Sequence, residues 1–343
     1  MKEVKIANYL IGKKHPVFVV AEAGINHNGS LAIAKKMVDV AKKADVSCLK
    51  FQTHIAEKEM IKSNITPGNI SKKTLWNIIK SCELTETEEE KINEYCKNKK
   101  LLFLSTPFSK EAVDRLEKIH IPAYKIGSGE LTNLPFLHYV AEKNKPVILS
   151  TGMSTLNEIR TSVNLFKKYR IPLILLQTTS TYPSEYKDVK LGVIEKLEKI
   201  FNLPIGISDH TPTLYTALAA VAKGACIVEK HFTLDKNMPG PDQRFSLNPQ
   251  ELTELVQGCQ AVKLALGGTK NILKKEKPIL RFARESVVSI RDINKGEKFS
   301  AKNISCKRPG TGPIPAKEYF RVIGHTAKRN ITNDKQLSWN DIL

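Results

Sequence analysis

Two histidines, each close to an acidic residue, lie in one stretch of the chain, residues 206–242. A short β-type run ends in Asp209-His210, a helical run follows, and a second β-type run carries Glu229 and His231. In a parallel α/β fold the carboxyl ends of neighbouring strands meet on one face, where catalytic residues collect. Imidazoles in oxygen-rich surroundings suit Mn²⁺ or another divalent cation such as Mg²⁺. The pattern predicts a metal held by His210 and His231; the alternative is a pair of hydrogen-bonded structural histidines.

Other polar side chains lie inside apolar β-type runs or at their carboxyl ends. Lys50 in CLKFQT and Lys125 in AYKIGS are the clearest cases, because a charge in an apolar strand is costly unless it is paired or faces a polar pocket. Either lysine can pair with a structural carboxylate. Hydroxyls at the other strand ends favour an anion pocket, since phosphate accepts several charge-assisted hydrogen bonds. The further candidates are Glu22, Gln52, Thr106, Ser128, Glu130, Ser150, Ser180 and Ser208.

Glu22 and two further acidic or amide side chains are candidates by position. Glu22 ends the first β-type run, and it can be a general base, a ligand of metal-bound water or a buried structural acid. PGPD at 239–242 is typical of a turn, and its place after the last β-type run lets Asp242 face a substrate. Asn69 lies in PGN within the long loop after the second run, and loops of that length are often functional.

Eight β-type runs alternate with helical patterns over the first two-thirds of the chain. Several runs are continuously apolar, as expected of parallel strands covered on the outside. The runs span 18–24, 47–53, 101–107, 123–128, 146–152, 173–180, 204–209 and 226–232. Helix starts are indicated at Ser30, Thr85, Ser109, Thr155 and Pro249. The order predicts a (β/α)₈ TIM barrel. A doubly wound sheet is the alternative, but AEAGINHNGS lacks the GxGxxG loop typical of one.

The composition changes after the barrel pattern. We expect a catalytic barrel at 1–268, a basic linker at 269–286 and a small β-rich domain at 287–343, where short β-type runs and turn signals return. A segment of that length is small but can fold alone.

The bulk composition narrows the class of protein. The chain has 343 residues, a net charge of +19 and six cysteines without a CxxC pair, so reduced thiols in a cytoplasmic protein are expected. No apolar run reaches membrane-spanning length and no secretory signal is evident. The lysines are dispersed and no nucleic-acid motif occurs, so neither a nucleic-acid nor a membrane partner is expected.

Taken together, the motifs resemble one family over nearly the whole chain. AEAGINHNGS, KFQTH, STPFS, AYKIGSGE, ILSTGM, TSTYP, GISDHT, EKHFTLD and PGPD occur in the order typical of the sialic acid synthases, the N-acetylneuraminate synthase family. The tail with KRPGTG resembles the antifreeze-like (SAF) domain that these proteins carry at the carboxyl end. The resemblance implies condensation of phosphoenolpyruvate with N-acetylmannosamine and water, with C–O cleavage, to give N-acetylneuraminic acid and phosphate.

The resemblance also implies roles for matching residues. His210 and His231 would hold Mn²⁺, which polarises the sugar aldehyde, and Glu22 would act as a base or position water. Glu229 would face the same site. The phosphoenolpyruvate carboxylate would meet Lys50, Thr106 and Lys125, and its phosphate Ser128, Ser150 and Ser208. The sugar hydroxyls would meet Gln52, Asn69, Glu130, Tyr182 and Asp242. Arg308 would recognise the N-acetyl group from a second subunit, which implies a domain-swapped homodimer.

One position departs from the motif. Some bacterial members carry Asn where this chain has Ser180, which can still donate to phosphate but has a shorter reach. Related synthases that make legionaminic or pseudaminic acid share the core motifs, so a 6-deoxy-diacetamido mannose is an alternative acceptor. The high positive charge and the small appended domain leave a third possibility, a non-catalytic protein that binds anionic ligands.

Overall fold

The computed structural model describes residues 3–68 and 73–343. The chain divides into two compact units, Met1–Gly267 and Gly268–Leu343, and each is described by itself. The domain bounds expected from the sequence stay a prediction.

The first unit is built on eight parallel strands. They are β3 (Phe18–Gly24), β4 (Cys48–Thr53), β5 (Leu102–Pro107), β6 (Tyr124–Ile126), β7 (Val147–Ser150), β8 (Leu173–Thr178), β9 (Ile205–Ser208) and β10 (Ile227–His231). The sheet order is β5-β4-β3-β10-β9-β8-β7-β6, and the two end strands, β5 and β6, also lie in contact. The sheet therefore curves round into a barrel, which confirms the fold predicted from the alternating pattern.

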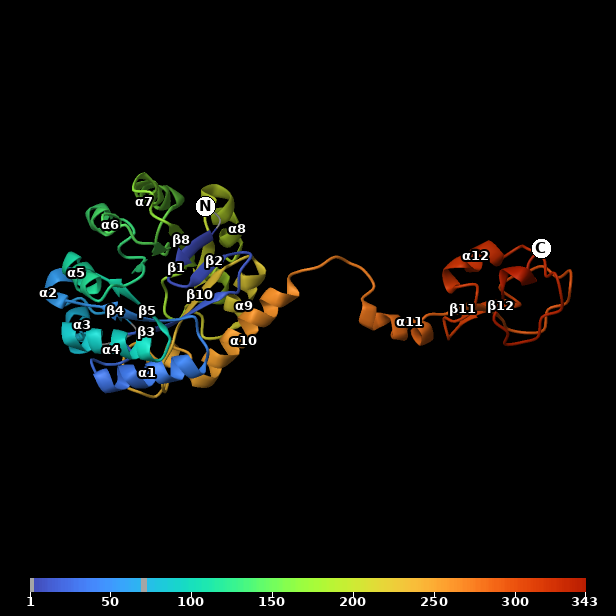
Figure 1. The fold of residues 1–343 in the computed structure, drawn as a ribbon, viewed down its shortest axis with the longest axis horizontal. Helices are drawn as coiled ribbons and strands as arrows, with labels where there is room; N and C mark the ends of the chain where they lie inside the picture. Colours follow the sequence, from blue (N-terminus) through green and yellow to red (C-terminus); the bar gives the residue numbers. More distant parts are fainter. Residues whose placement is uncertain (1–2, 69–72) are drawn as a thin grey trace. The chain divides into compact units, whose positions relative to one another are not determined.

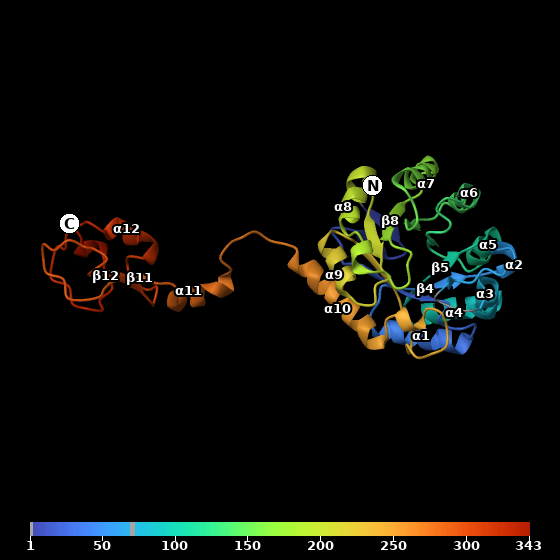
Figure 2. The same cartoon turned by 180° about the vertical axis from the view of Figure 1, so that it is seen from behind.

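Helices cover the outside of the strands, as Figures 1 and 2 show. They are α1 (Leu31–Lys43), α4 (Glu86–Asn98), α5 (Lys110–Lys118), α6 (Leu134–Ala141), α7 (Leu156–Lys168), α8 (Gly192–Phe201), α9 (Tyr215–Ala222) and α10 (Pro249–Ala265). The side chains of Ser30, Thr85, Ser109 and Thr155 each accept a backbone hydrogen bond at a helix start. Such caps contribute about 1 kcal/mol each, and their side chains fix the residue at which each strand-to-helix turn ends.

The strands are buried on both faces because the helices cover them outside and side chains fill the barrel inside. All six residues of β8 are buried, and β3 is buried along its whole length. A continuously apolar strand is therefore expected, and polar residues within it stand out. Successive side chains point to opposite faces of a strand, so neighbours in sequence can serve the barrel interior and the helix layer in turn.

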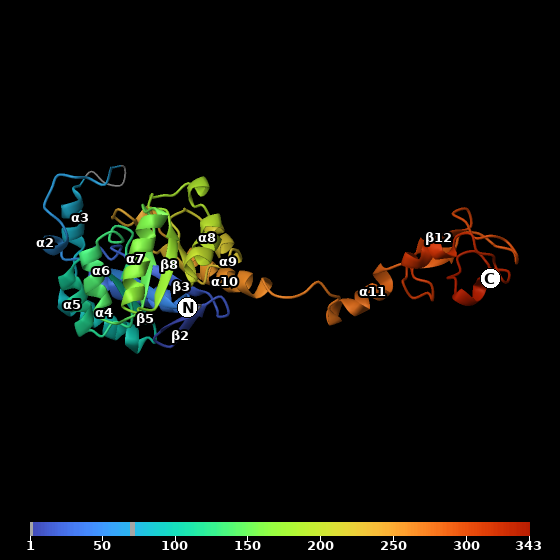
Figure 3. The same ribbon diagram turned by 90° about the horizontal axis from the view of Figure 1, so that it is seen from above.

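Two additions to the barrel have no counterpart in the predicted elements. A hairpin of β1 (Glu3–Ile6) and β2 (Tyr9–Gly12) precedes the barrel, with the Tyr9 ring 5.1 Å from the ring of Phe18, where β3 begins. The loop after β4 contains α2 (Ala56–Glu59) and α3 (Leu75–Cys82). In Figure 3 the hairpin lies at the bottom of this unit and the α2–α3 segment at the top. The hairpin thus covers the end where the strands begin.

The second unit has its own small core. It contains α11 (Lys277–Ala283), which falls in the segment expected to be a linker, an antiparallel pair β11 (Ser286–Ser289) and β12 (Ile304–Lys307), and α12 (Tyr319–Val322). Val287, Phe299, Ile304 and Leu337 are among its buried residues. None of the helices in the described part of the chain has the length and apolar character needed to span a membrane.

Candidate active site

A cavity of about 300 Å³ opens at the carboxyl ends of the barrel strands. Every one of the eight strands, or the turn that directly follows it, contributes a polar side chain to this cavity. The sequence-predicted residues that line it are Glu22, Lys50, Gln52, Thr106, Lys125, Ser128, Glu130, Ser150, Ser180, Tyr182, Ser208, His210, Glu229 and His231. The structure therefore brings together most of the set proposed from residue type and position.

The floor of the cavity is a buried cluster of two lysines and two glutamates. Lys50 Nζ lies 2.6 Å from Glu22 Oε2 and 3.7 Å from Glu229 Oε2, while Lys125 Nζ lies 3.3 Å from Glu229 Oε1. Ser208 donates to Glu229 at 3.0 Å, and Lys50 donates to Thr106 Oγ1 at 3.1 Å. All four charged side chains are almost fully buried. Only close pairing makes such burial tolerable, and an anionic ligand would compete for the same cations.

Burial and neighbouring charges set the pKa values of this cluster. Burial raises the pKa of Glu22 to about 7, against the opposing effect of the Lys50 cation. Burial also acts to raise the pKa of Glu229, but Lys125, Lys50 and the Ser208 hydrogen bond outweigh it and lower that pKa to about 2. Burial lowers the pKa of Lys125. Glu229 is thus the fixed anion of the cluster, and Glu22 is the carboxyl group that can change its protonation near neutral pH.

Hydroxyl groups and a glycine form a cradle beside this cluster. The backbone N–H of Gly152, in the turn after β7, donates to Ser128 Oγ at 3.0 Å. A Cβ atom on Gly152 would collide with the Oγ atoms of Ser128 and Ser180. Ser150 Oγ is buried and lacks a hydrogen-bond partner among the described residues. A buried hydroxyl without a partner is uncommon, and this one has the donor chemistry that a phosphate oxygen requires.

The two imidazoles lie side by side on the neighbouring strand ends, with ring centroids 5.4 Å apart. Nδ1 of His210 donates to the carbonyl of Thr179 at 2.7 Å, so the proton of this ring lies on Nδ1. The hydroxyl of Tyr182 donates to its Nε2 at 3.0 Å. Burial lowers the pKa of His210 and, together with the nearby His210 ring, lowers the pKa of His231 well below its usual range. Both rings are therefore neutral, as metal ligands require. Because His210 Nε2 accepts from Tyr182, that hydroxyl would have to turn aside for a metal to bind this ring.

The donor set fits an open divalent-metal site. His231 Nδ1 is buried without a hydrogen-bond partner in the described chain, and Asp242 Oδ2 lies 3.8 Å from it. Within residues 3–68 and 73–343, no three His, Cys, Asp or Glu side chains are grouped as a ligand set. The protein thus offers two imidazoles, and oxygens of water or substrate would complete the coordination, as in catalytic sites with open positions. The metal itself stays a prediction.

A second cavity of about 470 Å³ adjoins the first and shares Gln52, Phe108, Glu130 and Tyr182 with it. Its remaining wall is largely apolar and includes Ile25, Met60, Leu75, Ile78, Ile79 and Pro241. Asp242 lines this cavity, as proposed for a sugar-binding residue. Burial raises the pKa of Glu130 to about 7 and that of Asp242 to about 6. Two carboxyl groups that hold protons into the near-neutral range can donate to, as well as accept from, sugar hydroxyls.

The histidine that orients Gln52 was not among the site residues predicted from the sequence. His54 donates through Nε2 to Gln52 Oε1 at 3.0 Å, and its Nδ1 lies 2.9 Å from Glu59 Oε1. The Gln52 amide consequently turns its NH₂ group towards Glu22 Oε1, 3.1 Å away. His54 follows β4 directly, and the acid that holds it comes from the unpredicted helix α2. His54 could have been predicted as a site residue only if helix α2, which carries Glu59, had been predicted as well.

Two predicted site residues stay untested. Asn69 falls outside the described residues. Arg308 belongs to the second unit, where its Nε donates to the carbonyl of Ala283 at 3.1 Å and the side chain is exposed. Its role in the barrel cavity stays a prediction.

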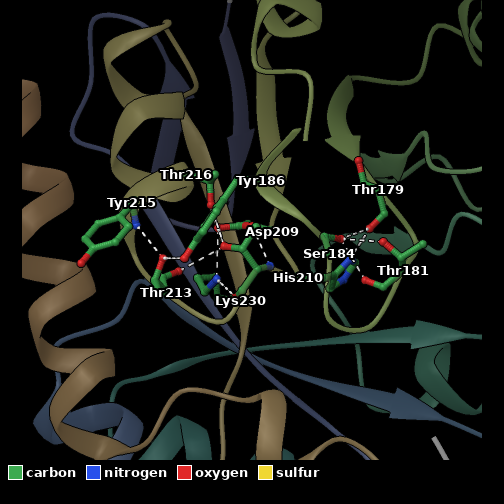
Figure 4. Close-up of polar contacts among 11 residues, drawn as sticks. Thr179, Thr181, Ser184, Tyr186, Asp209, His210, Thr213, Tyr215, Thr216 and Lys230 are labelled. Carbon is green, nitrogen blue, oxygen red and sulfur yellow. Dashed lines mark hydrogen bonds and ion pairs between the residues drawn. The ribbon is translucent and has the colours of Figure 1, made fainter. Parts of the chain in front are cut away.

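A buried cation behind the imidazoles was missed. Lys230, between Glu229 and His231, forms a 3.0 Å ion pair with Asp209 and does not line the cavity (Figure 4). It was visible as the middle one of three consecutive ionisable residues in one apolar strand, but its residue type and position alone did not distinguish it from the solvated lysines.

Comparison with known proteins gives the family. Sequences of the NeuB family match residues 37–271, and the SAF domain matches residues 284–343. The N,N'-diacetyllegionaminic acid synthase of Campylobacter jejuni is 40% identical over 92% of this chain and 97% of its own length. The synthase of the same description from Legionella pneumophila is 37% identical over 96% of each chain.

A solved structure agrees with these matches. The N-acetylneuraminic acid (sialic acid) synthetase of Leptospira borgpetersenii, in complex with citrate, superposes with a TM-score of 0.73 at 35% identity over 81% of this chain and 95% of that one. The resemblance inferred from the ordered motifs is confirmed. The chain belongs to the NeuB family of sialic-acid-type synthases and carries its SAF domain at residues 284–343.

Proposed function

We propose that the protein condenses phosphoenolpyruvate with the open-chain aldehyde of an N-acetylated mannosamine-type sugar and with water, releasing phosphate. The observation that carries the proposal is the single cavity in which two buried lysines and a hydroxyl cradle adjoin two neutral imidazoles. Phosphoenolpyruvate has a carboxylate and a phosphate group. The lysine cations and the hydroxyl donors of this cavity suit these two anionic groups.

Lys50, Thr106 and Lys125 would bind the carboxylate of phosphoenolpyruvate, because their polar atoms meet at the cavity floor. Ser128, Ser150, Ser180 and Ser208 would bind the phosphate. The orphaned Ser150 hydroxyl and the close packing of the Ser128 and Ser180 hydroxyls against Gly152 support that division. Holding both anionic ends fixes the plane of the enol, so that its C3 faces the aldehyde carbon.

The bond changes follow from that placement. C3 of the enol forms a bond to the aldehyde carbon, the aldehyde oxygen takes up a proton, and C2 is left electron-deficient. Water adds to C2 with loss of a proton, and the C2–O bond to phosphate then breaks. Glu22 is the group proposed to orient or deprotonate that water, since its pKa of about 7 lets it change protonation near neutral pH.

His210 and His231 would hold a divalent cation, Mn²⁺ by the chemistry of the ligands. When bound, the ion supplies a Lewis acid next to the aldehyde oxygen. The chain's own contribution is to keep both imidazoles neutral by burial and to fix the tautomer of His210 through the Thr179 carbonyl.

Two sugars are candidates for the acceptor. We propose a 6-deoxy-diacetamido mannose as the preferred acceptor, because the second cavity has an apolar wall that includes Ile25, Met60 and Ile78. A C6 methyl and a second acetyl methyl gain about 0.8 kcal/mol for each buried carbon, whereas a C6 hydroxyl buried without a partner costs about 1–3 kcal/mol. The names of the two legionaminic acid synthases support this choice. N-Acetylmannosamine, expected from the sequence motifs, is the second candidate, supported by the 35% identical sialic acid synthetase.

A phosphate-release assay with both sugars tests the proposal. We expect release from phosphoenolpyruvate only when a sugar and a divalent cation are present, with kcat/KM at least about tenfold higher for the diacetamido sugar. The His210→Ala and His231→Ala variants should lose turnover, while His138→Ala, on an exposed face of α6, should keep it. A reversed ratio would select N-acetylmannosamine. Sugar-independent release, or no release with either sugar, would refute the condensation.

A further inference from the structure

Lys230 is a buried cation that the proposed reaction does not use. Its side chain is 2% exposed, and it points away from the cavity into the layer between strand and helix. Its Nζ lies 3.0 Å from Asp209 Oδ2 and donates to the carbonyl of Thr211 at 2.8 Å. The side chain of Asp209 is fully buried. Figure 4 shows Lys230 and Asp209 together, next to His210.

The carboxylate of Asp209 is fully hydrogen-bonded. Its Oδ1 accepts from the Thr211 backbone N–H at 3.0 Å, and its Oδ2 accepts from the hydroxyls of Thr216 at 2.7 Å and Thr211 at 3.2 Å. Thr216 lies on α9, so the network ties the turn that carries His210 to the following helix. A buried ion pair adds little stability over an apolar pair of similar volume, but a fully satisfied one fixes geometry.

The Asp209–Lys230 ion pair lies at the point where the backbone hydrogen bonds between β9 and β10 end. The β9–β10 register runs from Val228↔Ile207 to Glu229↔Ser208, and one further bond joins the Asp209 N–H to the Glu229 carbonyl at 3.0 Å. No strand pairing between β9 and β10 is recorded beyond that bond in the described chain. The Asp209–Lys230 contact therefore continues the connection through side chains, one residue before each imidazole.

His210 is held from its other side as well. Its Nδ1–H donates to the Thr179 carbonyl, which also accepts from Ser184 Oγ at 3.2 Å, and the Ser184 N–H donates to the His210 carbonyl at 3.0 Å. The ring of His210 is thus clamped against the β8 loop, while β10 is paired with β3 as far as His231↔Glu22. On the side of β10 that faces β9, the Asp209–Lys230 pair is the side-chain contact next to both imidazoles.

We propose that Asp209 and Lys230 are positioning residues that set the separation of His210 and His231, and thereby the affinity of the barrel for a divalent cation. This inference rests on the metal site of the proposed function. Outer contacts that orient metal-binding histidines typically change metal affinity 10- to 100-fold when lost.

The test is a titration of the full-length protein with Mn²⁺ in the absence of substrates. Binding is measured as the loss of the electron paramagnetic resonance signal of the free ion. The double variant Asp209→Asn/Lys230→Met keeps the shape of both side chains and removes both charges, so it avoids an unpaired buried ion. We expect it to fold, and to bind Mn²⁺ at least about tenfold more weakly than the wild type. The single variant Lys230→Met should weaken binding as well, with a larger loss of thermal stability.

The matched control removes a comparable buried ion pair far from the histidines in sequence. Glu89 on α4 and Arg115 on α5 lie 3.4 Å apart, with side chains 4% and 15% exposed. Glu89→Gln/Arg115→Met should change thermal stability and leave Mn²⁺ affinity at the wild-type value.

Two outcomes overturn the inference, and they are distinguishable. A folded Asp209→Asn/Lys230→Met variant that binds Mn²⁺ as tightly as the wild type shows that the pair does not position the imidazoles. Wild-type protein whose Mn²⁺ binding is absent, or unchanged by His210→Ala, overturns the metal site itself and this inference with it.

Discussion

At the scale of single residues, burial fixes the charge state of the cavity. Glu229 is held as an anion by two lysines, whereas Glu22 and Glu130 have their pKa values raised to about 7 by burial. The site thus contains both a permanent negative charge and carboxyl groups that are protonated below neutral pH. When Glu22 and Glu130 are protonated, an anion that binds in this cavity meets repulsion from fewer carboxylate charges.

Glu130 gives a test of this assignment through stability. Its pKa is about 7 in the folded protein against a usual 4.5, so between these values the folded state holds a proton that the unfolded state has lost. Stability must therefore fall as pH rises through this window, by up to about 3 kcal/mol. Glu130→Gln removes that dependence.

The measurement is urea unfolding of wild type and Glu130→Gln at pH 5 and pH 8. We expect the variant to gain up to about 3 kcal/mol on the wild type between the two conditions. Glu111→Gln, at an exposed position of α5, serves as the matched control and should track the wild type. Equal pH dependence in wild type and Glu130→Gln would contradict the raised pKa.

The sequence predicted the cavity residues that face inward better than those that support them. Lys50, Lys125 and Glu229 stand out because each interrupts an apolar strand. Lys230 interrupts the same kind of strand, yet which face of the barrel it serves depends on register, which a single sequence does not specify. The orientation of Gln52 by His54 depends on Glu59 in α2. This helix is too short to leave a periodic pattern in the sequence, so the contact could not be predicted.

At the scale of elements, the turn after β7 has the tightest requirement in the site. Gly152 lies between the hydroxyls of Ser128 and Ser180, and a methyl group there would displace both. We expect Gly152→Ala to raise the KM for phosphoenolpyruvate at least about tenfold, the equivalent of one to two lost charge-assisted hydrogen bonds, with the sugar KM nearly unchanged.

Steady-state kinetics with each substrate varied in turn checks this expectation. Gly192→Ala is the matched control, because a Cβ on Gly192, at the start of α8, would meet no atom within 4 Å. If Gly152→Ala raised the sugar KM instead, the cradle would belong to the acceptor and not to phosphate.

Elements with a strong local signal were predictable, and those defined by tertiary contact were not. The eight strands and the capped helices α1, α4, α5, α7 and α10 follow from apolar runs and N-cap residues. The β1–β2 hairpin escaped prediction because its strands have four residues each and its place depends on packing against the barrel, as Tyr9 does against Phe18. Helices α2 and α3 also escaped prediction: they have four and eight residues, and Leu75, Ile78 and Ile79 of α3 line the wall of the second cavity instead of packing on the barrel.

At the scale of the whole molecule, the chain consists of two units with separate cores. The sequence indicated this division through the change in composition after the barrel pattern. The family resemblance implies that Arg308 reaches the barrel of a partner subunit, and this stays a prediction, as does the alternative that it serves its own chain. Subunit complementation distinguishes the two.

The complementation uses two inactive full-length variants. Lys125→Met removes a cavity cation and Arg308→Ala removes the proposed acetyl-binding side chain, so each alone should have little activity. If tails are exchanged within a homodimer, mixing and refolding the two should restore roughly a quarter of wild-type activity, since half of the dimers are mixed and each of these has one complete site. Lys125→Met mixed with Lys50→Met should restore none. No recovery in the first mixture would exclude exchange.

The consecutive placement of Glu229, Lys230 and His231 on β10 limits how this gene can change. Because side chains alternate strictly along a strand, inserting or deleting one codon just upstream of β10 would slip the strand by one place. Lys230 would then enter the cavity, while the carboxylate and the imidazole turned towards the helices. Insertions and deletions should accordingly be tolerated in the surface loops and should abolish activity when they fall between α9 and the end of β10.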